Sequence, residues 1–105
     1  MVEIEWTTPA FAQLEALPQA VAFEIIRQVD ALAAFPNLGA PLEIRFPALR
    51  GYRQLIVKRQ YRAVYEFDER AQTIYVLAAQ SCRQKLPTRR DLKRGFPTEN
   101  DELGD

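Results

Sequence analysis

The stretch GYRQLIVKRQYRAVYEF, residues 51–67, decides the fold, because it predicts two strands joined by a short basic turn. The first strand covers residues 52–57 and the second covers residues 61–67. Since side chains alternate between the faces of a strand, Arg62, Val64 and Glu66 should lie on one face and the residues between them on the other. Cations occur among these apolar residues more densely than a strand pair that only builds a core requires.

The residues before this stretch predict a strand followed by two helices. Residues 2–6, VEIEW, alternate apolar and acidic side chains, as in a strand with one buried face. A threonine pair then offers an N-cap before Pro9, which is suited to the first turn of a short helix. Pro18 can begin a second helix, whose apolar residues recur at helical spacing and which ends before Pro36. We expect the two helices to pack antiparallel.

A third strand and a basic segment follow the central stretch. Residues 73–80 are almost continuously apolar, which fits a strand covered on both faces. A proline-rich, irregular connection at residues 36–51 should lead from the helices back to the sheet, and Pro87 can open a short basic helix. We assign residues 1–94 to a single domain and residues 95–105 to an acidic, mobile tail.

The resulting order is β-α-α-β-β-β, which predicts a two-layer α+β fold. The three later strands should form an antiparallel meander, and the helical hairpin should cover one face of the sheet. The other face, together with the C-terminal segment, would then be left for function.

Charge is distributed unevenly along a chain whose net charge is zero. Residues 45–94 hold thirteen cations and four carboxylates, a net charge of +9, whereas residues 1–44 hold one cation and six carboxylates. A basic half of this kind can face a phosphate backbone. The alternative is that the cations form an ordinary solvated surface.

Composition excludes several classes of protein. The chain has no histidine and one cysteine, Cys82, so neither a zinc site nor any other metal or cofactor is expected. It has no apolar run long enough to span a bilayer and no basic-then-apolar signal segment at its start. A single cysteine also agrees with a reducing compartment. We therefore expect a cytoplasmic protein without a membrane partner.

Eight cations are candidates for a functional site. Arg53, Arg62 and Arg83 can meet near one end of the meander, and guanidinium groups match phosphate oxygens with paired donors. The alternative for each is an ion pair with a nearby carboxylate such as Glu66 or Asp68. Further phosphate-binding candidates surround them: Lys58, Arg59, Lys85, Arg89 and Arg90.

The segment LRGYRQLIVKRQYRAVYEFDERAQTIYVLAAQSCRQK, preceded by FPNLGAPL, resembles the RelE/ParE superfamily of bacterial type II toxins. The similarity runs from Val2 to about Arg94, and its most specific part is YRAVYEF followed by a strand and a basic exit. The resemblance implies the element order given above. It also implies growth arrest, plasmid stabilisation and a cognate antitoxin that binds and neutralises the toxin in a hetero-oligomer.

The superfamily has two main branches. RelE-like members cut mRNA in the ribosomal A site without a metal. For them the resemblance implies that Arg53 handles the scissile phosphate, Arg62 stabilises the transition state and Arg83 serves the leaving group. Fixed cations suit this chemistry because attack by a 2′-hydroxyl on its own phosphate builds negative charge. ParE-like members poison DNA gyrase instead.

Two departures count against the nuclease branch. Leu55 stands where RelE-like sequences often have a second lysine, and no tyrosine follows Arg83, since Arg89 occupies that position. Our first interpretation is a ribosome-dependent mRNA endonuclease, an mRNA interferase with ribosome and mRNA as partners. A gyrase poison is the alternative, and a catalytically inactive binding module of the same fold is the third.

Overall fold

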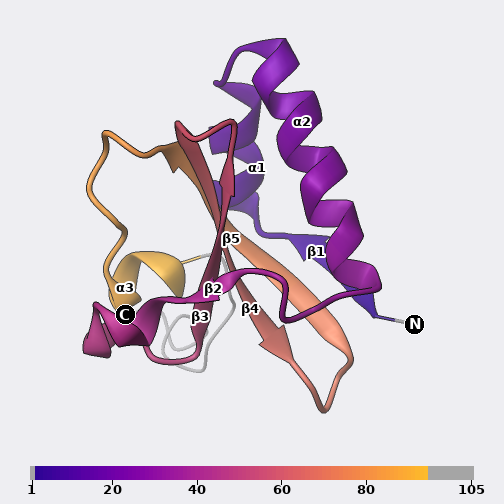
Figure 1. Ribbon diagram of the computed structural model, residues 1–105, viewed down its shortest axis with the longest axis vertical. Coiled ribbons are helices and arrows are strands. Elements are labelled where there is room, and N and C mark those ends of the chain that lie inside the picture. Colours follow the sequence, from indigo (N-terminus) through magenta and orange to yellow (C-terminus); the bar gives the residue numbers. More distant parts are fainter. Residues whose placement is uncertain (1, 95–105) are drawn as a thin grey trace, which may run out of the picture.

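The computed structural model describes residues 2–94 as a five-stranded sheet with two helices on one face (Figure 1). This confirms the expected α+β class and the β-α-α-β-β-β order, with one additional short strand. The elements in chain order are β1 (Glu3–Trp6), α1 (Thr8–Glu15), α2 (Gln19–Asp30), η1 (Ala31–Ala33), β2 (Ala40–Pro41), η2 (Leu42–Ile44), η3 (Pro47–Leu49), β3 (Tyr52–Val57), β4 (Tyr61–Asp68), β5 (Thr73–Ser81) and α3 (Arg89–Leu92), where η marks a short 3₁₀ helix. The acidic segment 95–105 lies outside the described residues.

The sheet has the strand order β1-β5-β4-β3-β2. The meander of β3, β4 and β5 is antiparallel, as expected, whereas β1 pairs with β5 in parallel. The prediction of an antiparallel sheet is therefore corrected at this edge. The parallel pairing is possible because the two helices form the long crossover connection that parallel strands require. Strand β2 was not expected, and it pairs with the start of β3.

The helical pair covers one face of the sheet. Thr7 caps α1, since its hydroxyl accepts a hydrogen bond from the Ala10 N–H (3.4 Å) and donates one to the Val76 carbonyl (3.0 Å). Helix α2 follows Pro18 and continues as η1 up to the residues before Pro36. Buried residues of the helices and the strands form the main core: Ala10, Leu14, Ile25, Val29, Leu32, Leu55, Val57, Ala63, Tyr65, Ile74, Val76 and Ala79.

The second face is covered as well, which corrects the expectation that it stays open. Val64 pairs with Ala78 and Tyr65 with Val76, so Leu77 is an extra residue in β5. Leu77 and Ala78 therefore both join a smaller core on this face. Strands β3 and β4 add Tyr52 and Val64 to this core. The connection after β2 supplies Leu42 and Leu49, and the short helix α3, which Thr88 caps, supplies Leu92. Strand β5 is thus buried on both faces, as its apolar sequence predicted.

The proline-rich connection is held to the sheet by one side chain. The Tyr65 hydroxyl accepts a hydrogen bond from the Gly39 N–H (2.9 Å) and donates one to the Pro36 carbonyl (2.7 Å). Tyr65 is fully buried, so both backbone groups are paired away from water. These two hydrogen bonds fix the path of the backbone between the helices and β2.

Candidate functional site

The turn between β3 and β4 carries two cations on a strained backbone. Lys58 and Arg59 have φ angles of 54° and 63°, in the left-handed region. The Gln60 N–H donates to the Val57 carbonyl (3.3 Å), which closes a turn of the kind that favours Asn-Gly. A residue with a Cβ costs about 1 kcal/mol in this conformation. Strain kept in an exposed turn by two basic residues points to function rather than to stability.

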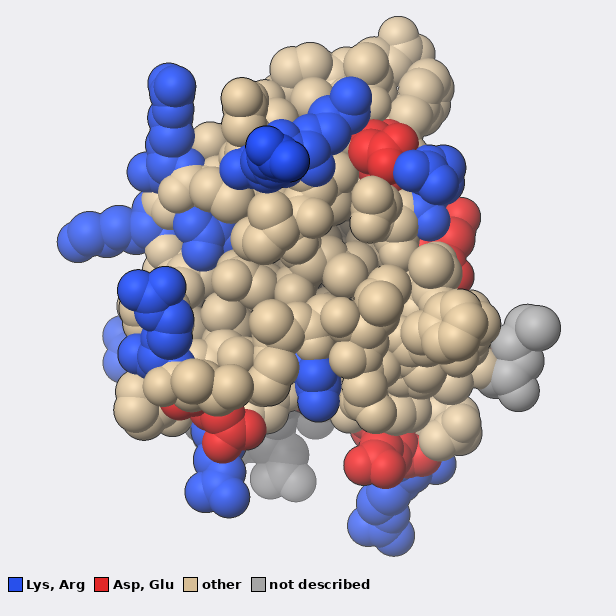
Figure 2. All heavy atoms as spheres, viewed as in Figure 1, with Lys and Arg blue, Asp and Glu red and all other residues tan. Residues whose placement is uncertain are grey.

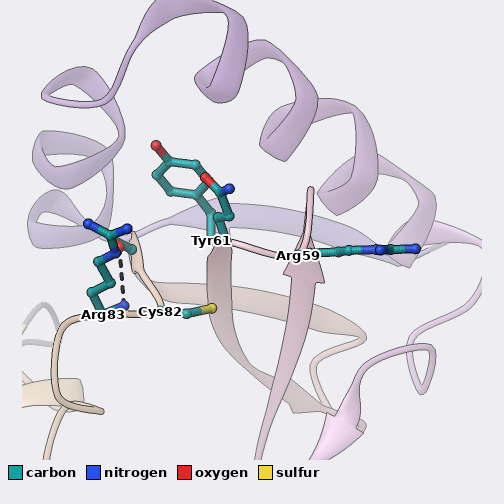
Figure 3. A pocket seen from close by; sticks show the side chains of 6 residues that line it. Arg59, Tyr61, Cys82 and Arg83 are labelled. Carbon is teal, nitrogen blue, oxygen red and sulfur yellow. Dashed lines mark hydrogen bonds between the residues drawn. The ribbon is translucent and has the colours of Figure 1, made fainter.

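Beside this turn lies an open hollow of about 400 Å³ (Figure 3). The Cys82 N–H donates to the Gln60 carbonyl (2.8 Å), and so ties the end of β5 to the turn. The Arg83 N–H donates to the Ser81 hydroxyl (3.1 Å). In Figure 3 the side chains of Arg59 and Arg83 extend on opposite sides of the hollow. This arrangement suits an extended anionic surface better than one phosphate held between two guanidiniums.

Arg62 is buried next to the segment that follows β5 and is bound by neutral oxygens. Only 9% of its surface is exposed. Its guanidinium donates to the backbone carbonyls of Cys82 (3.0 Å) and Gln84 (3.4 Å), and to the Gln54 side-chain oxygen (3.4 Å). Its Nε is buried without a partner, and within residues 2–94 no carboxylate forms a salt bridge with it. The ion pair with Glu66 or Asp68 that we considered for it is not formed.

Arg53 lies on the other face of the sheet, so the expected convergence of three arginines is wrong. Arg53 is paired with Tyr65, whereas Arg62 is paired with Ile56. Because Arg53 and Ile56 are three residues apart on one strand, their side chains point to opposite faces. The Arg53 guanidinium donates to the carbonyls of Gly39 and Asn37 (2.6 and 3.3 Å), beside the helical layer.

The remaining candidate cations divide into one structural residue and several exposed ones. Arg89 donates to the carbonyls of Ala48 (3.1 Å) and Arg50 (2.8 Å), and its guanidinium lies 5.2 Å from the centre of the Tyr52 ring. It therefore fastens α3 to the connection before β3. Exposed cations are Lys58, Arg59, Arg83, Lys85 and Arg90. Figure 2 shows basic side chains gathered at the β3–β4 turn and along the side where α3 lies.

Sequence reasoning missed the residues that line the hollow together with Arg59 and Arg83. They are Gln60, Tyr61, Ser81 and Cys82. No motif marks them, because they meet only through the pairing of β4 with β5. The left-handed conformation of the β3–β4 turn was not predicted either. The sequence signal that could have suggested it is a basic pair at the two positions where a short hairpin turn favours Asn-Gly.

Glu66 allows the burial of the second face of the sheet to be tested. It is half-buried between its cross-strand neighbours Tyr52 and Tyr75. Burial and, to a smaller extent, the charge of Asp68 raise the pKa of Glu66, whereas the nearby cations Arg89 and Lys93 lower it. Because the folded protein holds this proton more tightly than the unfolded chain, stability should fall as pH rises from the ordinary glutamate pKa through the raised value.

We therefore expect Glu66→Gln to unfold at a higher temperature than the parent at pH 7 and at the same temperature near pH 4. Thermal unfolding followed by circular dichroism at both pH values measures this. Glu69→Gln, in the exposed β4–β5 turn, removes the same charge and serves as the control. An equal gain in both variants would attribute the effect to net charge instead of burial.

Two properties of residues 2–94 bear on other functions. This part of the chain contains no group of three or more His, Cys, Asp or Glu side chains placed to hold a metal ion. None of its helices has the length and apolar character needed to cross a bilayer.

The fold is shared with toxins of known structure. The chain is 24% identical to the RelBE2 toxin-antitoxin complex of Mycobacterium tuberculosis, with 76% of this chain and 96% of that chain covered and a TM-score of 0.64. It is also 24% identical to the ParDE system of Pseudomonas aeruginosa, with coverage of 77% and 96% and a TM-score of 0.60. Isolated RelE of Escherichia coli is 9% identical, with coverage of 99% and 95% and a TM-score of 0.64.

Sequence comparison identifies the family. The family described as the ParE toxin of the type II toxin-antitoxin system parDE matches residues 4–86, which is most of the chain. The chain therefore belongs to the ParE toxin family, within the RelE/ParE superfamily of type II toxins, as its sequence resemblance indicated. No curated protein matches it.

Proposed function

We propose that this toxin arrests growth in the cytoplasm by poisoning DNA gyrase, and that a cognate antitoxin neutralises it. The observation that carries the proposal is the division of Arg53 and Arg62 between opposite faces of the sheet. Cleavage of RNA by its own 2′-hydroxyl needs cations fixed around a single phosphate. Arg53 and Arg62 cannot meet there without rearranging the sheet, whereas a poison needs only a surface that binds its target.

The strained turn and its hollow are the surface best suited to that target. Lys58, Arg59 and Arg83 are exposed there, and the hollow between them is open. Such a surface can contact an acidic protein surface or the DNA held by gyrase, since its attraction to phosphates does not depend on sequence. Membership of the ParE family supports the same choice, because ParE-like members act on gyrase.

The antitoxin is supported by the relatives. The similar Mycobacterium tuberculosis and Escherichia coli structures include complexes of a toxin with its antitoxin. The chain described here has the same fold and leaves several large apolar side chains exposed, among them Phe23, Phe35, Leu38 and Ile44. An exposed apolar surface of this kind is typical of a protein that is stored in a complex.

A direct comparison of the two targets tests the function. Purified toxin should trap gyrase in a cleaved, protein-linked complex on plasmid DNA and should leave mRNA on programmed ribosomes intact. In growing cells, incorporation of thymidine should stop before incorporation of leucine. Toxin already bound by its antitoxin is the control and should do neither. Transcripts cut within codons, together with unaffected gyrase, would instead establish the ribosome-dependent nuclease.

A further inference from the structure

Arg62 is a buried cation without an anion. Its three acceptors are neutral oxygens, and its Nε has no partner. Neutral dipoles compensate a buried charge only in part, so the site is completed when a negatively charged oxygen binds.

A hollow of about 370 Å³ gives access to this guanidinium from the second face of the sheet. Arg62 and Gln54 line it together with residues of β2 and of the connection that follows, and its outer part is mainly apolar, with Arg45 as its one further cation. Ile44 is 77% exposed and Phe46 is 43% exposed, and Leu86 closes the side toward α3. The hollow therefore combines a charged interior with a mainly apolar rim that also carries Arg45.

This combination selects one kind of occupant. A nucleic-acid backbone is charged at every residue and would place phosphates against Ile44 and Phe46, which offer them no donor. A peptide can present one carboxylate between apolar side chains, and so match both the interior and the rim. Figure 2 agrees, since the surface over β2 and β3 is largely uncharged, while most cations lie around it.

We propose that the antitoxin inserts one carboxylate into this hollow, where it pairs with Arg62, while flanking apolar residues cover Ile44 and Phe46. The inference rests on the antitoxin named in the proposed function, but it does not depend on gyrase as the target. It assigns Arg62 to inhibitor binding instead of catalysis. It also explains why an exposed isoleucine borders a buried charge.

The experiment uses the protein encoded beside this chain as the antitoxin, co-expressed and purified with it. Arg62→Met removes the charge at similar volume and should weaken the complex about 100-fold, as loss of one partner of a buried charge pair does. Ile44→Asp places a like charge at the rim and should weaken it more than about 10-fold. Arg70→Met, an exposed arginine in the β4–β5 turn, is the matched control and should bind normally.

A double-mutant cycle locates the carboxylate. Each Asp and Glu of the antitoxin is changed to its amide, and one of these changes should have no further effect once Arg62 is methionine.

Ile44→Asp keeps the test valid if Arg62→Met fails to fold, because Ile44 is exposed. Normal binding by Ile44→Asp, or a cycle in which no acid couples to Arg62, would overturn the inference while leaving the gyrase proposal intact. The same would follow if Ile44→Asp lost affinity for a short oligoribonucleotide and not for the antitoxin. Failure of the unaltered chain to bind the neighbouring protein would remove the antitoxin proposal as well.

Discussion

Gly39→Ala is expected to lower the free energy of unfolding by about 3 kcal/mol or more, the upper end of the overpacking range. A Cβ at this position would lie 2.7 Å from the Cε1 atom of Tyr65 and 2.8 Å from the backbone oxygen of Gln54. Neither atom can move easily, because the Tyr65 ring is fully buried and Gln54 belongs to β3. The clash also displaces the Gly39 N–H from the Tyr65 hydroxyl.

Thermal and urea unfolding measure this loss, which for a domain of this size lowers the melting temperature by roughly 10 °C or more. Gly51→Ala is the matched control. Gly51 has a φ of 94°, but a Cβ there meets nothing within 4 Å, so only backbone strain of about 1 kcal/mol is added. Equal losses in the two variants would show that backbone conformation, and not close packing against Tyr65, makes Gly39 necessary.

The second large effect concerns the β3–β4 turn. Changing Lys58 to Asn and Arg59 to Gly replaces a strained basic pair with the residues that such a turn favours. The double variant should therefore gain about 1–2 kcal/mol in stability, since two left-handed residues with costly side chains are relieved. We expect its toxicity to fall at least about 10-fold, because close charge pairs across an interface contribute on the order of 1.5 kcal/mol or more.

Cell survival after induction and melting temperature are the two measurements. Gln72→Asn is the control, because Gln72 also has a left-handed φ, of 51°, but lies in the β4–β5 turn and carries no charge. That variant should be relieved of strain and remain fully toxic. A double variant that is more stable and equally toxic would show that the two cations have no part in target binding. One that is less stable would show that the turn is not strained.

The two faces of the molecule respond to separate substitutions in these proposals. We propose that the turn and its hollow act on the target, and that the hollow at Arg62 receives the antitoxin. Antitoxin binding can therefore be weakened at Ile44 without altering Lys58 or Arg59. The segment after β5 links both places, because its backbone contacts Arg62 on one side and the turn on the other.

Local features of the sequence were sufficient to predict the main helices and strands of this fold, but not the short strand β2. Alternation in residues 51–67, helical spacing after Pro18 and the apolar run of β5 depend on contacts between near neighbours in the chain. The fold class followed from them, whereas the superfamily was indicated by the resemblance of the segment that contains YRAVYEF. The short links between the strands were also enough to predict the meander, since they allow only antiparallel neighbours.

Only the tertiary structure decided which side chains share a site. The pairing register places Arg53 and Arg62 on opposite faces, and the extra residue in β5 puts both Leu77 and Ala78 into the second core. A shift of one residue in a strand moves every side chain to the other face, and register depends on the turn and the packing together. The need for glycine at position 39 arises in the same way, from a tyrosine far along the chain. Residue types and spacing identified the cations of this toxin, but their surroundings were set by contacts between distant parts of the chain.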